Sequence, residues 1–243
     1  MLKTTEAQTQ PTVMVVAGAG NVRERHHSAL EVSLLPAFVA IDRLHAKTTR
    51  VLHRAIAEMS AHHELVVPHN YGMGLPTRSY KRTAAVLDQK LEKHDGERIL
   101  LVGHSLGAFI ATIYSHDHPE QNIETIAFAG PFHGVNLMPF SARLFAEHTQ
   151  RIRDIRTDMG SEAPKLTLVG TQNDILVPVH SALPDLPNAD KVLFTAGTEL
   201  ATDGEWRTIA ADSAPGHLSI LNHPESLAIC QQAVSLQQLQ PAA

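Results

Sequence analysis

The sequence predicts an α/β fold in which helices flank a mostly parallel central sheet of about six strands. Two observations predict this class. Short apolar runs without polar alternation recur along the chain, as is typical of strands buried on both faces, and longer segments with helical spacing separate them. Because strands and helices alternate along the sequence, we expect right-handed crossovers and a doubly wound sheet.

Each predicted element is a continuous stretch with one type of spacing. The predicted strands are, in chain order, Val13–Ala17, Leu65–Val67, Ile99–Val102, Thr125–Ala129, Leu166–Val169 and Val192–Thr195. The predicted helices are Leu44–Met59, Thr77–Leu91, Ala108–Tyr114 and Pro224–Leu236. Only about ten residues precede the first apolar run, so we expect a compact version of such a fold, with no room for extra antiparallel strands before it.

Length and composition favour a single domain over residues 1–243. The chain has 243 residues, of which 43% are hydrophobic and 19% charged, and it can therefore bury a large core. The single cysteine, Cys230, has no partner for an internal disulfide and lies in a segment with apolar periodicity. We expect its side chain in the core.

Charge and hydropathy argue against two classes of partner. The formal net charge of −5 is spread without a long run of either sign, so we expect no nucleic-acid-binding face and no polybasic membrane-binding segment. No apolar stretch reaches about 18 residues, the length that suggests a membrane span, so we expect no stable membrane anchor. The first ten residues are polar and lack the apolar region of a signal peptide, which favours a cytoplasmic protein. The sequence makes no prediction of oligomeric state.

A serine stands at a sharp turn between a predicted strand and a predicted helix. The motif Gly-x-Ser-x-Gly occupies residues 103–107 and directly follows the strand Ile99–Val102. In this context the two glycines allow the chain to turn tightly and leave the Ser105 hydroxyl exposed at the carboxyl edge of the sheet. Ligands of such sheets bind beyond the carboxyl ends of the strands, so Ser105 is the predicted nucleophile.

A serine nucleophile needs a base within hydrogen-bond reach and a third group that orients the base. Asp174 lies in the loop after the strand Leu166–Val169, at a carboxyl end of the sheet, and is the predicted orienting carboxylate. His217 lies in a loop after the final predicted strand and just before the last helix, and is the predicted general base. The order serine, acid, histidine along the chain is the one that accompanies this type of turn.

Two other histidines compete with His217 for the role of base. His223 immediately precedes Pro224, the first residue of the predicted last helix, and so favours a role at the helix entry. His180 follows Asp174 too closely to be presented by a separate strand end. Both are weaker candidates than His217.

Two backbone N–H groups are predicted to hold the oxyanion of a tetrahedral intermediate. One belongs to Leu106, the residue after the nucleophile. The other is assigned to Ala19, in the glycine-rich turn after the first strand. That turn also resembles the start of a dinucleotide fingerprint, but Arg23 stands where the third glycine should be.

Taken together, the turn after the first strand, the motif at Ser105, Asp174 and His217 resemble the α/β-hydrolases, in particular the compact bacterial lipases and their GPI inositol-deacylase-like relatives. The resemblance spans nearly the whole chain. It implies a compact α/β-hydrolase fold and a serine esterase or lipase that acts through an acyl-enzyme on carboxylic esters, with no cofactor. The expected partner is then a small-molecule or lipid ester substrate.

The chain departs from this family's pattern in two places. Family members often have His-Gly after the first strand, whereas this chain has Ala17-Gly18. Many also carry Gly-x-Pro-His-x-Gly after the strand that follows the serine, whereas residues 130–134 read Gly-Pro-Phe-His-Gly. We therefore assign His133 no catalytic role.

Two segments are candidates for binding the substrate. Residues 131–164 interrupt the strand pattern, and apolar residues within them recur at near-helical spacing. One hypothesis is a cap or lid-like insertion in which Met138 and Phe140 line an acyl-chain pocket; the alternative is ordinary core packing. Met73 and Leu75, in a loop at another strand end, are predicted to line the same pocket.

Histidine pairs in the chain suggest a metal site only superficially. Adjacent histidines point in different directions, and no cysteine or acid completes a ligand spacing. We therefore predict no metal. The predicted reaction is ester hydrolysis, with acyl transfer to an alcohol or thiol, or thioester hydrolysis, as alternatives that the residues do not separate. A noncatalytic binding protein of the same fold is a third alternative, which would be expected to lack a triad member.

Overall fold

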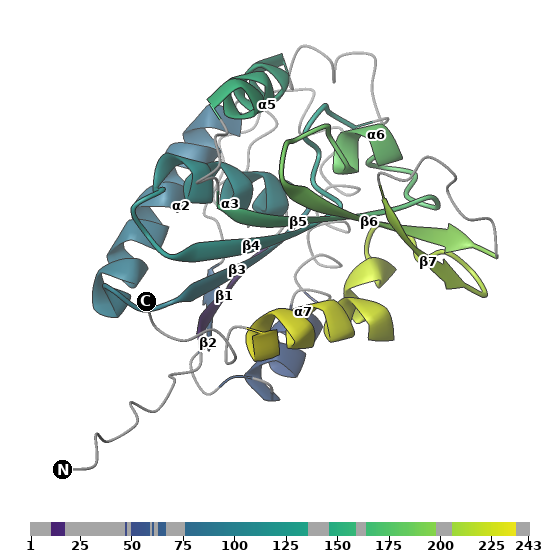
Figure 1. Cartoon of the computed structure of the whole chain (residues 1–243), viewed down its shortest axis with the longest axis horizontal. Coiled ribbons are helices and arrows are strands. Elements are labelled where there is room, and N and C mark those ends of the chain that lie inside the picture. The colour runs from purple at the N-terminus through teal and green to yellow at the C-terminus, as the bar shows by residue number, and fades with distance from the viewer. Residues whose placement is uncertain are drawn as a thin grey trace, which may run out of the picture.

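The structure is a computed structural model that describes residues 11–17, 47, 50–58, 60, 63–66, 76–135, 146–158, 164–197 and 206–236. Within these residues seven parallel strands form one sheet, in the order β2-β1-β3-β4-β5-β6-β7 (Figure 1). The strands are β1 (Thr12–Val16), β2 (His63–Val66), β3 (Ile99–His104), β4 (Ile123–Phe128), β5 (Lys165–Thr171), β6 (Ala189–Ala196) and β7 (Arg207–Ala211). The predicted α/β class with a parallel sheet is confirmed.

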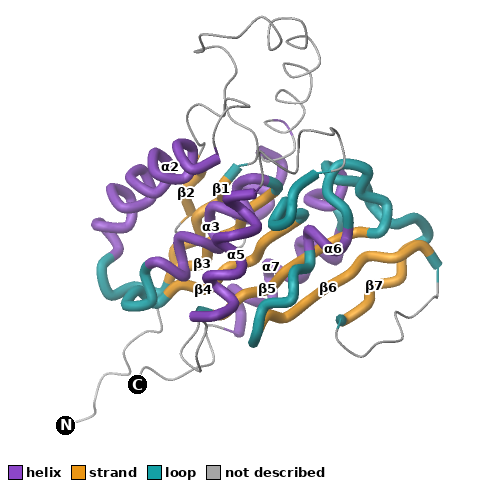
Figure 2. The backbone as a smooth tube through the Cα atoms, turned by 90° about the horizontal axis from the view of Figure 1, so that it is seen from above, coloured by secondary structure: helices purple, strands orange, loops and turns teal. Residues whose placement is uncertain are grey.

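Helices cover both faces of the sheet. The helices are α2 (Pro76–Leu91), η2 (Glu92–His94), α3 (Leu106–Asp117), α5 (Ala146–Asp158), α6 (Val179–Ala182), η3 (Ser219–Asn222) and α7 (Pro224–Leu236), with a further helical segment at residues 50–58. Helices α2, α3 and α5 lie on one face, and α7 lies on the other beside the helical segment 50–58 (Figures 1 and 2). Both faces of the central strands are therefore buried, as the apolar runs predicted.

Alternate residues of each central strand belong to different cores. Met14 and Leu101 pack with α2, α3 and α5, whereas Val15 and Leu100 pack with α7 and the segment 50–58. All six residues of β3 are buried. Since a fully buried Leu or Val contributes about 1.5–3 kcal/mol, these two apolar layers supply most of the stability of the sheet.

The strand order reverses at β1. The chain passes from β1 to β2 on one side and then returns across β1 to β3, from which it continues outward to β7 (Figure 2). The helices that follow β1 and β3 lie on opposite faces of the sheet, and α/β proteins commonly bind ligands at such a reversal, beyond the carboxyl ends of the strands. Ser105 follows β3 and so lies at this reversal.

The sequence predicted about six strands, and the seventh, β7, is the difference. Arg207–Ala211 forms an edge strand, and none of its five residues is buried. An edge strand with little burial has no continuous apolar run by which the sequence could reveal it. Strand β4 also ends one residue earlier than predicted, because Ala129 has a φ of +48° and leaves the sheet.

The described part of the predicted cap segment is a crossover helix. Helix α5 joins β4 to β5, and its Ile152 and Ile155 are buried in the same core as α2 and α3. Arg151 of α5 pairs with Asp117 of α3, and the Tyr80 hydroxyl of α2 donates to the same carboxylate at 2.5 Å. Helix α5 itself therefore packs on the core, and the cap or lid-like insertion stays a hypothesis. Residues 136–145, which include Met138 and Phe140, lie outside the described residues.

Two glycines allow α3 to begin directly against the ends of β1 and β3. A Cβ added at Gly103 would lie 2.5 Å from the Cα of Ala108, and one at Gly107 would lie 2.3 Å from the carbonyl oxygens of both Val16 and Ala17. Real Cβ atoms do not approach backbone this closely. Only glycine fits at these positions without moving the helix away from the strands.

We predict that Gly107→Ala lowers the free energy of unfolding by about 1–3 kcal/mol, because the new methyl group overpacks a contact between two backbone segments. Chemical denaturation measures the effect. Gly216→Ala is the matched control, since its Cβ would meet no atom closer than 3.8 Å. Equal stability of Gly107→Ala and wild type would contradict this account of the packing.

The reactivity of the Cys230 thiol shows whether α7 covers the sheet in solution. The Cys230 side chain is fully buried, and burial raises the pKa of the thiol to about 12. We predict that Ellman's reagent modifies the native protein at least about 100-fold more slowly than the unfolded protein, because only the thiolate reacts. The assay is unambiguous because Cys230 is the chain's only cysteine. A native rate that matched the unfolded rate would show that α7 does not cover the sheet as described.

Candidate active site

Ser105 stands at the turn between β3 and α3 in a backbone conformation that is rare for a residue with a side chain. Its φ and ψ are 54° and −127°. Such conformations cost about 1–3 kcal/mol and persist where the surroundings impose them. Here the Ser105 N–H donates to the Phe128 carbonyl at 2.8 Å, and the Ser105 carbonyl accepts from the Ala108 N–H at 2.9 Å. The turn is thus tied to β4 on one side and to α3 on the other.

His217 approaches Ser105 from the loop between β7 and η3. Its Nε2 lies 3.1 Å from the Ser105 Oγ, within hydrogen-bond distance. The imidazole side chain is 4% exposed. The structure therefore brings together two residues that are 112 positions apart in the sequence.

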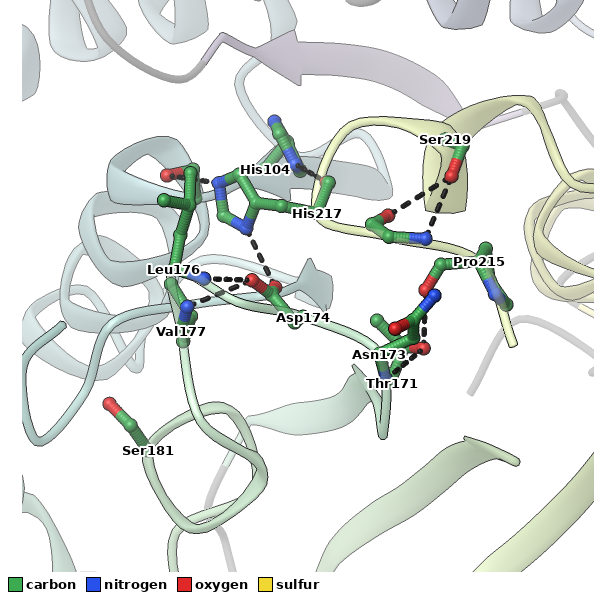
Figure 3. Close-up of polar contacts among 12 residues, drawn as sticks. His104, Thr171, Asn173, Asp174, Leu176, Val177, Ser181, Pro215, His217 and Ser219 are labelled. Atoms are coloured by element: carbon green, nitrogen blue, oxygen red, sulfur yellow. Dashed lines mark hydrogen bonds and ion pairs between the residues drawn. The ribbon is translucent and has the colours of Figure 1, made fainter. Parts of the chain in front are cut away.

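Asp174 completes the chain of hydrogen bonds from the loop after β5. Its Oδ2 lies 2.7 Å from the His217 Nδ1, and its side chain is 1% exposed (Figure 3). Its Oδ1 accepts from the N–H groups of Leu176 and Val177, each at 2.8 Å. One carboxylate oxygen is held by the backbone, and the other is thereby aimed at the imidazole.

The direction of these hydrogen bonds sets the tautomer of His217. An ionised carboxylate only accepts, so the His217 Nδ1 carries the hydrogen that lies between the two residues. The Nε2 then presents its lone pair to the Ser105 hydroxyl, which is the orientation in which it can accept the hydroxyl proton. Because both side chains are almost fully buried, water does not compete for these bonds.

Of the two predicted oxyanion donors, the structure describes Leu106. Leu106 is the first residue of α3, where backbone N–H groups have no intrahelical acceptor and the helix dipole favours negative charge. Ala19 lies outside the described residues. The described end of β1 reaches Ala17, which contacts Gly107 in the first turn of the same helix. Met73 and Leu75 also lie outside the described residues.

The competing histidines have other environments. His223 precedes α7 as expected: its Nδ1 accepts from the Glu225 N–H at 3.3 Å, and its ring packs edge-on against Phe194. His180 lies on α6. His133 is exposed, and burial of part of its ring lowers its pKa. None of these three histidines shares a hydrogen bond with Ser105 in the described part of the chain.

Two other kinds of feature are absent from the described part of the chain. No group of three or more His, Cys, Asp or Glu side chains is arranged there to hold a metal ion. The Nδ1 of His118, in the sequence His116-x-His118, lies 3.3 Å from the Glu120 Oε1. Among the helices described, none has the length and hydropathy needed to cross a bilayer.

Sequence reasoning missed the side chains that hold the His217 loop, which we define as residues 214–217. These side chains belong to His104, Thr171, Asn173 and Ser219 (Figure 3). Their partners are main-chain atoms, and for three of the four they are distant in the sequence. Residue spacing carries no signal for such contacts, although His104 stands conspicuously inside the Gly-x-Ser-x-Gly motif.

The chain is similar to one protein family over part of its length. Residues 77–176 match the family described as serine aminopeptidase, S33. The match includes Ser105 and Asp174 and ends before His217, and it indicates a hydrolase. No curated protein sequence is detectably similar to this chain.

Solved structures with a similar fold cover almost the whole chain. Est1E from Butyrivibrio proteoclasticus is 12% identical, with a TM-score of 0.53 over 96% of this chain and 90% of that one. The monoacylglycerol lipase of Paleococcus ferrophilus is 13% identical, with a TM-score of 0.52 over 95% and 96%. The 2-hydroxy-6-oxo-6-phenylhexa-2,4-dienoate hydrolase of Rhodococcus sp. strain RHA1 is 13% identical, with a TM-score of 0.54 over 95% and 92%. With its parallel sheet, its turn at Ser105 and these likenesses, the chain has the α/β-hydrolase fold, so the fold that the resemblance implied is confirmed.

Proposed function

We propose that the protein is a serine hydrolase that cleaves carboxylic esters through an acyl-enzyme. The observation that carries the proposal is the continuous line of hydrogen bonds from Asp174 through His217 to Ser105, with the serine on a strained turn at the carboxyl edge of the sheet. A structural serine needs neither a buried imidazole nor a buried carboxylate behind it. This arrangement is the one that activates a hydroxyl for attack.

In the first half of the reaction, the Ser105 Oγ bonds to the ester carbonyl carbon while its proton passes to the His217 Nε2. Asp174 stabilises the imidazolium that forms. The carbonyl oxygen becomes an oxyanion, which the N–H groups of Leu106 and Ala19 bind. When the tetrahedral intermediate collapses, the carbon–oxygen bond to the alcohol breaks, and the proton on His217 goes to the departing alcohol.

In the second half, water takes the place of the alcohol. His217 accepts a proton from the water as its oxygen bonds to the acyl carbon, and the same oxyanion donors act again. Collapse of this second intermediate breaks the bond between the acyl carbon and the Ser105 Oγ. The proton returns to Ser105, the carboxylic acid leaves, and the site is regenerated.

The substrate is proposed to be a small-molecule or lipid ester with an apolar portion. Ile175, directly after Asp174, has a relative exposure of 76%, so an apolar side chain stands in solvent next to the site. Met73, Leu75, Met138 and Phe140 are proposed to extend this apolar surface. The names of the structural neighbours, which include an esterase and a lipase, agree with such a substrate.

The matching family's description favours hydrolysis of an N-terminal amide bond as a second candidate. The same three residues would act, since an amine leaves with the proton of His217 just as an alcohol does. Aminoacyl p-nitroanilides and p-nitrophenyl esters of matched acyl groups separate the two. Product analysis with added alcohol or thiol separates hydrolysis from acyl transfer.

We predict that Ser105→Ala abolishes hydrolysis of p-nitrophenyl butyrate and laurate, because the attacking oxygen is lost. Residual turnover should be at least about 1,000-fold below wild type. Ser115→Ala is the matched control, since Ser115 is a buried serine whose hydroxyl donates to the Thr112 carbonyl of its own helix. Circular dichroism checks that both variants fold. Equal turnover by wild type and Ser105→Ala would exclude Ser105 as the nucleophile.

We predict that Asp174→Asn lowers kcat by about 10³–10⁴-fold with little change in KM. An amide presents a donor where the carboxylate accepted, so His217 no longer keeps its hydrogen on Nδ1 and its lone pair on Nε2. Asp212→Asn, at an exposed aspartate, is the control and should leave kcat unchanged. Retention of more than a tenth of wild-type kcat in Asp174→Asn would rule out the proposed role.

A further inference from the structure

The His217 loop is held by side chains at every one of its residues. All four of its carbonyls accept from side chains, and one of its N–H groups donates to a side chain. The pairs are Ala214 O with Asn173 Nδ2 at 3.1 Å, Pro215 O with Thr171 Oγ1 at 2.5 Å, Gly216 N and Gly216 O with Ser219 Oγ at 2.8 Å and 3.3 Å, and His217 O with His104 Nε2 at 2.8 Å. A loop without regular structure is therefore fixed residue by residue.

These contacts come from two directions. Thr171 and Asn173 belong to the end of β5 and the loop that carries Asp174, so the base and its orienting carboxylate are tied together as one unit (Figure 3). His104 belongs to β3 and directly precedes Ser105. Of the four side chains that hold the loop, His104 alone comes from β3, the strand that leads into Ser105.

The position of His104 on β3 explains how it reaches the loop. Side chains alternate along a strand, so His104 shares a face with Leu100 and Val102, which pack toward α7. Gly103 faces the other way, against α3. The motif thus places a small residue where the helix must approach and a hydrogen-bond donor where the chain leading into α7 passes.

In the hydrogen bond between His104 and the His217 carbonyl, His104 is the donor. A carbonyl oxygen only accepts, so the Nε2 of His104 carries the hydrogen. His104 is 1% exposed, which means that water cannot replace the donor without opening the core. The two imidazole rings also pack together, with centroids 4.9 Å apart and planes at 43°. His104 therefore contacts both the main chain and the ring of the base.

We propose that His104 is a positioning residue that holds His217 at the distance from Ser105 required for proton transfer. This inference rests on the proposed function. A catalytic group displaced by about 1 Å loses on the order of 100-fold in rate. Without its anchor to β3, the His217 loop keeps its contacts to Asp174 and β5 but loses the contact that sets its distance from the nucleophile.

The test compares His104→Leu, which removes the donor at similar volume, with His104→Gln, which restores an amide donor of similar reach. The first readout is the rate at which a fluorophosphonate labels Ser105, together with kcat and KM for p-nitrophenyl butyrate. We expect His104→Leu to slow labelling and to lower kcat by about 10- to 100-fold at constant KM. We expect His104→Gln to recover most of both rates.

A second readout does not depend on turnover. The proton between the His217 Nδ1 and Asp174 should give a low-field NMR resonance, identified by its loss in Asp174→Asn. We expect this resonance to weaken or shift in His104→Leu and to return in His104→Gln. Thermal unfolding is measured for every variant, and Leu101→Val, on the opposite face of the same strand, controls for a general loss of core stability.

The outcomes separate the two proposals. If wild type is not labelled and hydrolyses no ester, the proposed function fails, and the resonance alone then decides whether His104 positions His217. If labelling, kcat and the resonance are the same in His104→Leu and wild type, the inference about His104 is wrong. If Leu101→Val slows labelling as much as His104→Leu does at equal stability, the effect belongs to the core and the inference is again wrong.

Discussion

The close approach of α3 to the ends of β1 and β3 is the constraint on which the site depends. Without side chains at Gly103 and Gly107, the helix starts one residue after the strand ends, and Ser105 must take a strained conformation to make that turn. The strain of about 1–3 kcal/mol is offset by the buried contacts of α3 with both strands. As a result, the Ser105 side chain and the first N–H groups of α3 are held together at one tight turn.

The loops that carry Asp174 and His217 lie at the same edge of the sheet as Ser105, because strands end there. The sheet order places β4 between β3 and β5, so Ser105 and the Asp174 loop stand two strands apart at the same edge. His217 returns to that edge after β7, on the way to α7. Because Thr171 and Asn173 bind the His217 loop, Asp174 and His217 form one unit, and that unit meets the strand before Ser105 at His104. Because the strands are parallel, three segments that are distant in the sequence meet at one edge of the sheet.

Much of this could be predicted from the sequence because the informative signals are local. Continuous apolar runs indicated the central strands, and the contiguous pattern of strand, Gly-x-Ser-x-Gly and helix indicated Ser105. Asp174 and His217 followed from the order in which strand ends deliver residues to one edge, and the structure brings them together with Ser105. Residues whose setting depends on burial were harder to predict: β7 is an edge strand without a buried residue and so has no continuous apolar run.

By itself, the sequence determined the fold class, the turn at Ser105 and the identities of its two partners, because each is encoded in a short stretch with its own periodicity or spacing. Only the tertiary structure decided the distances of 3.1 Å and 2.7 Å that link them, and the side chains that hold the His217 loop. Those contacts join main-chain atoms to side chains from strands far apart in the sequence, such as the His217 carbonyl to His104. Such pairs have no periodicity along the chain, since it is sheet order and packing that bring them together.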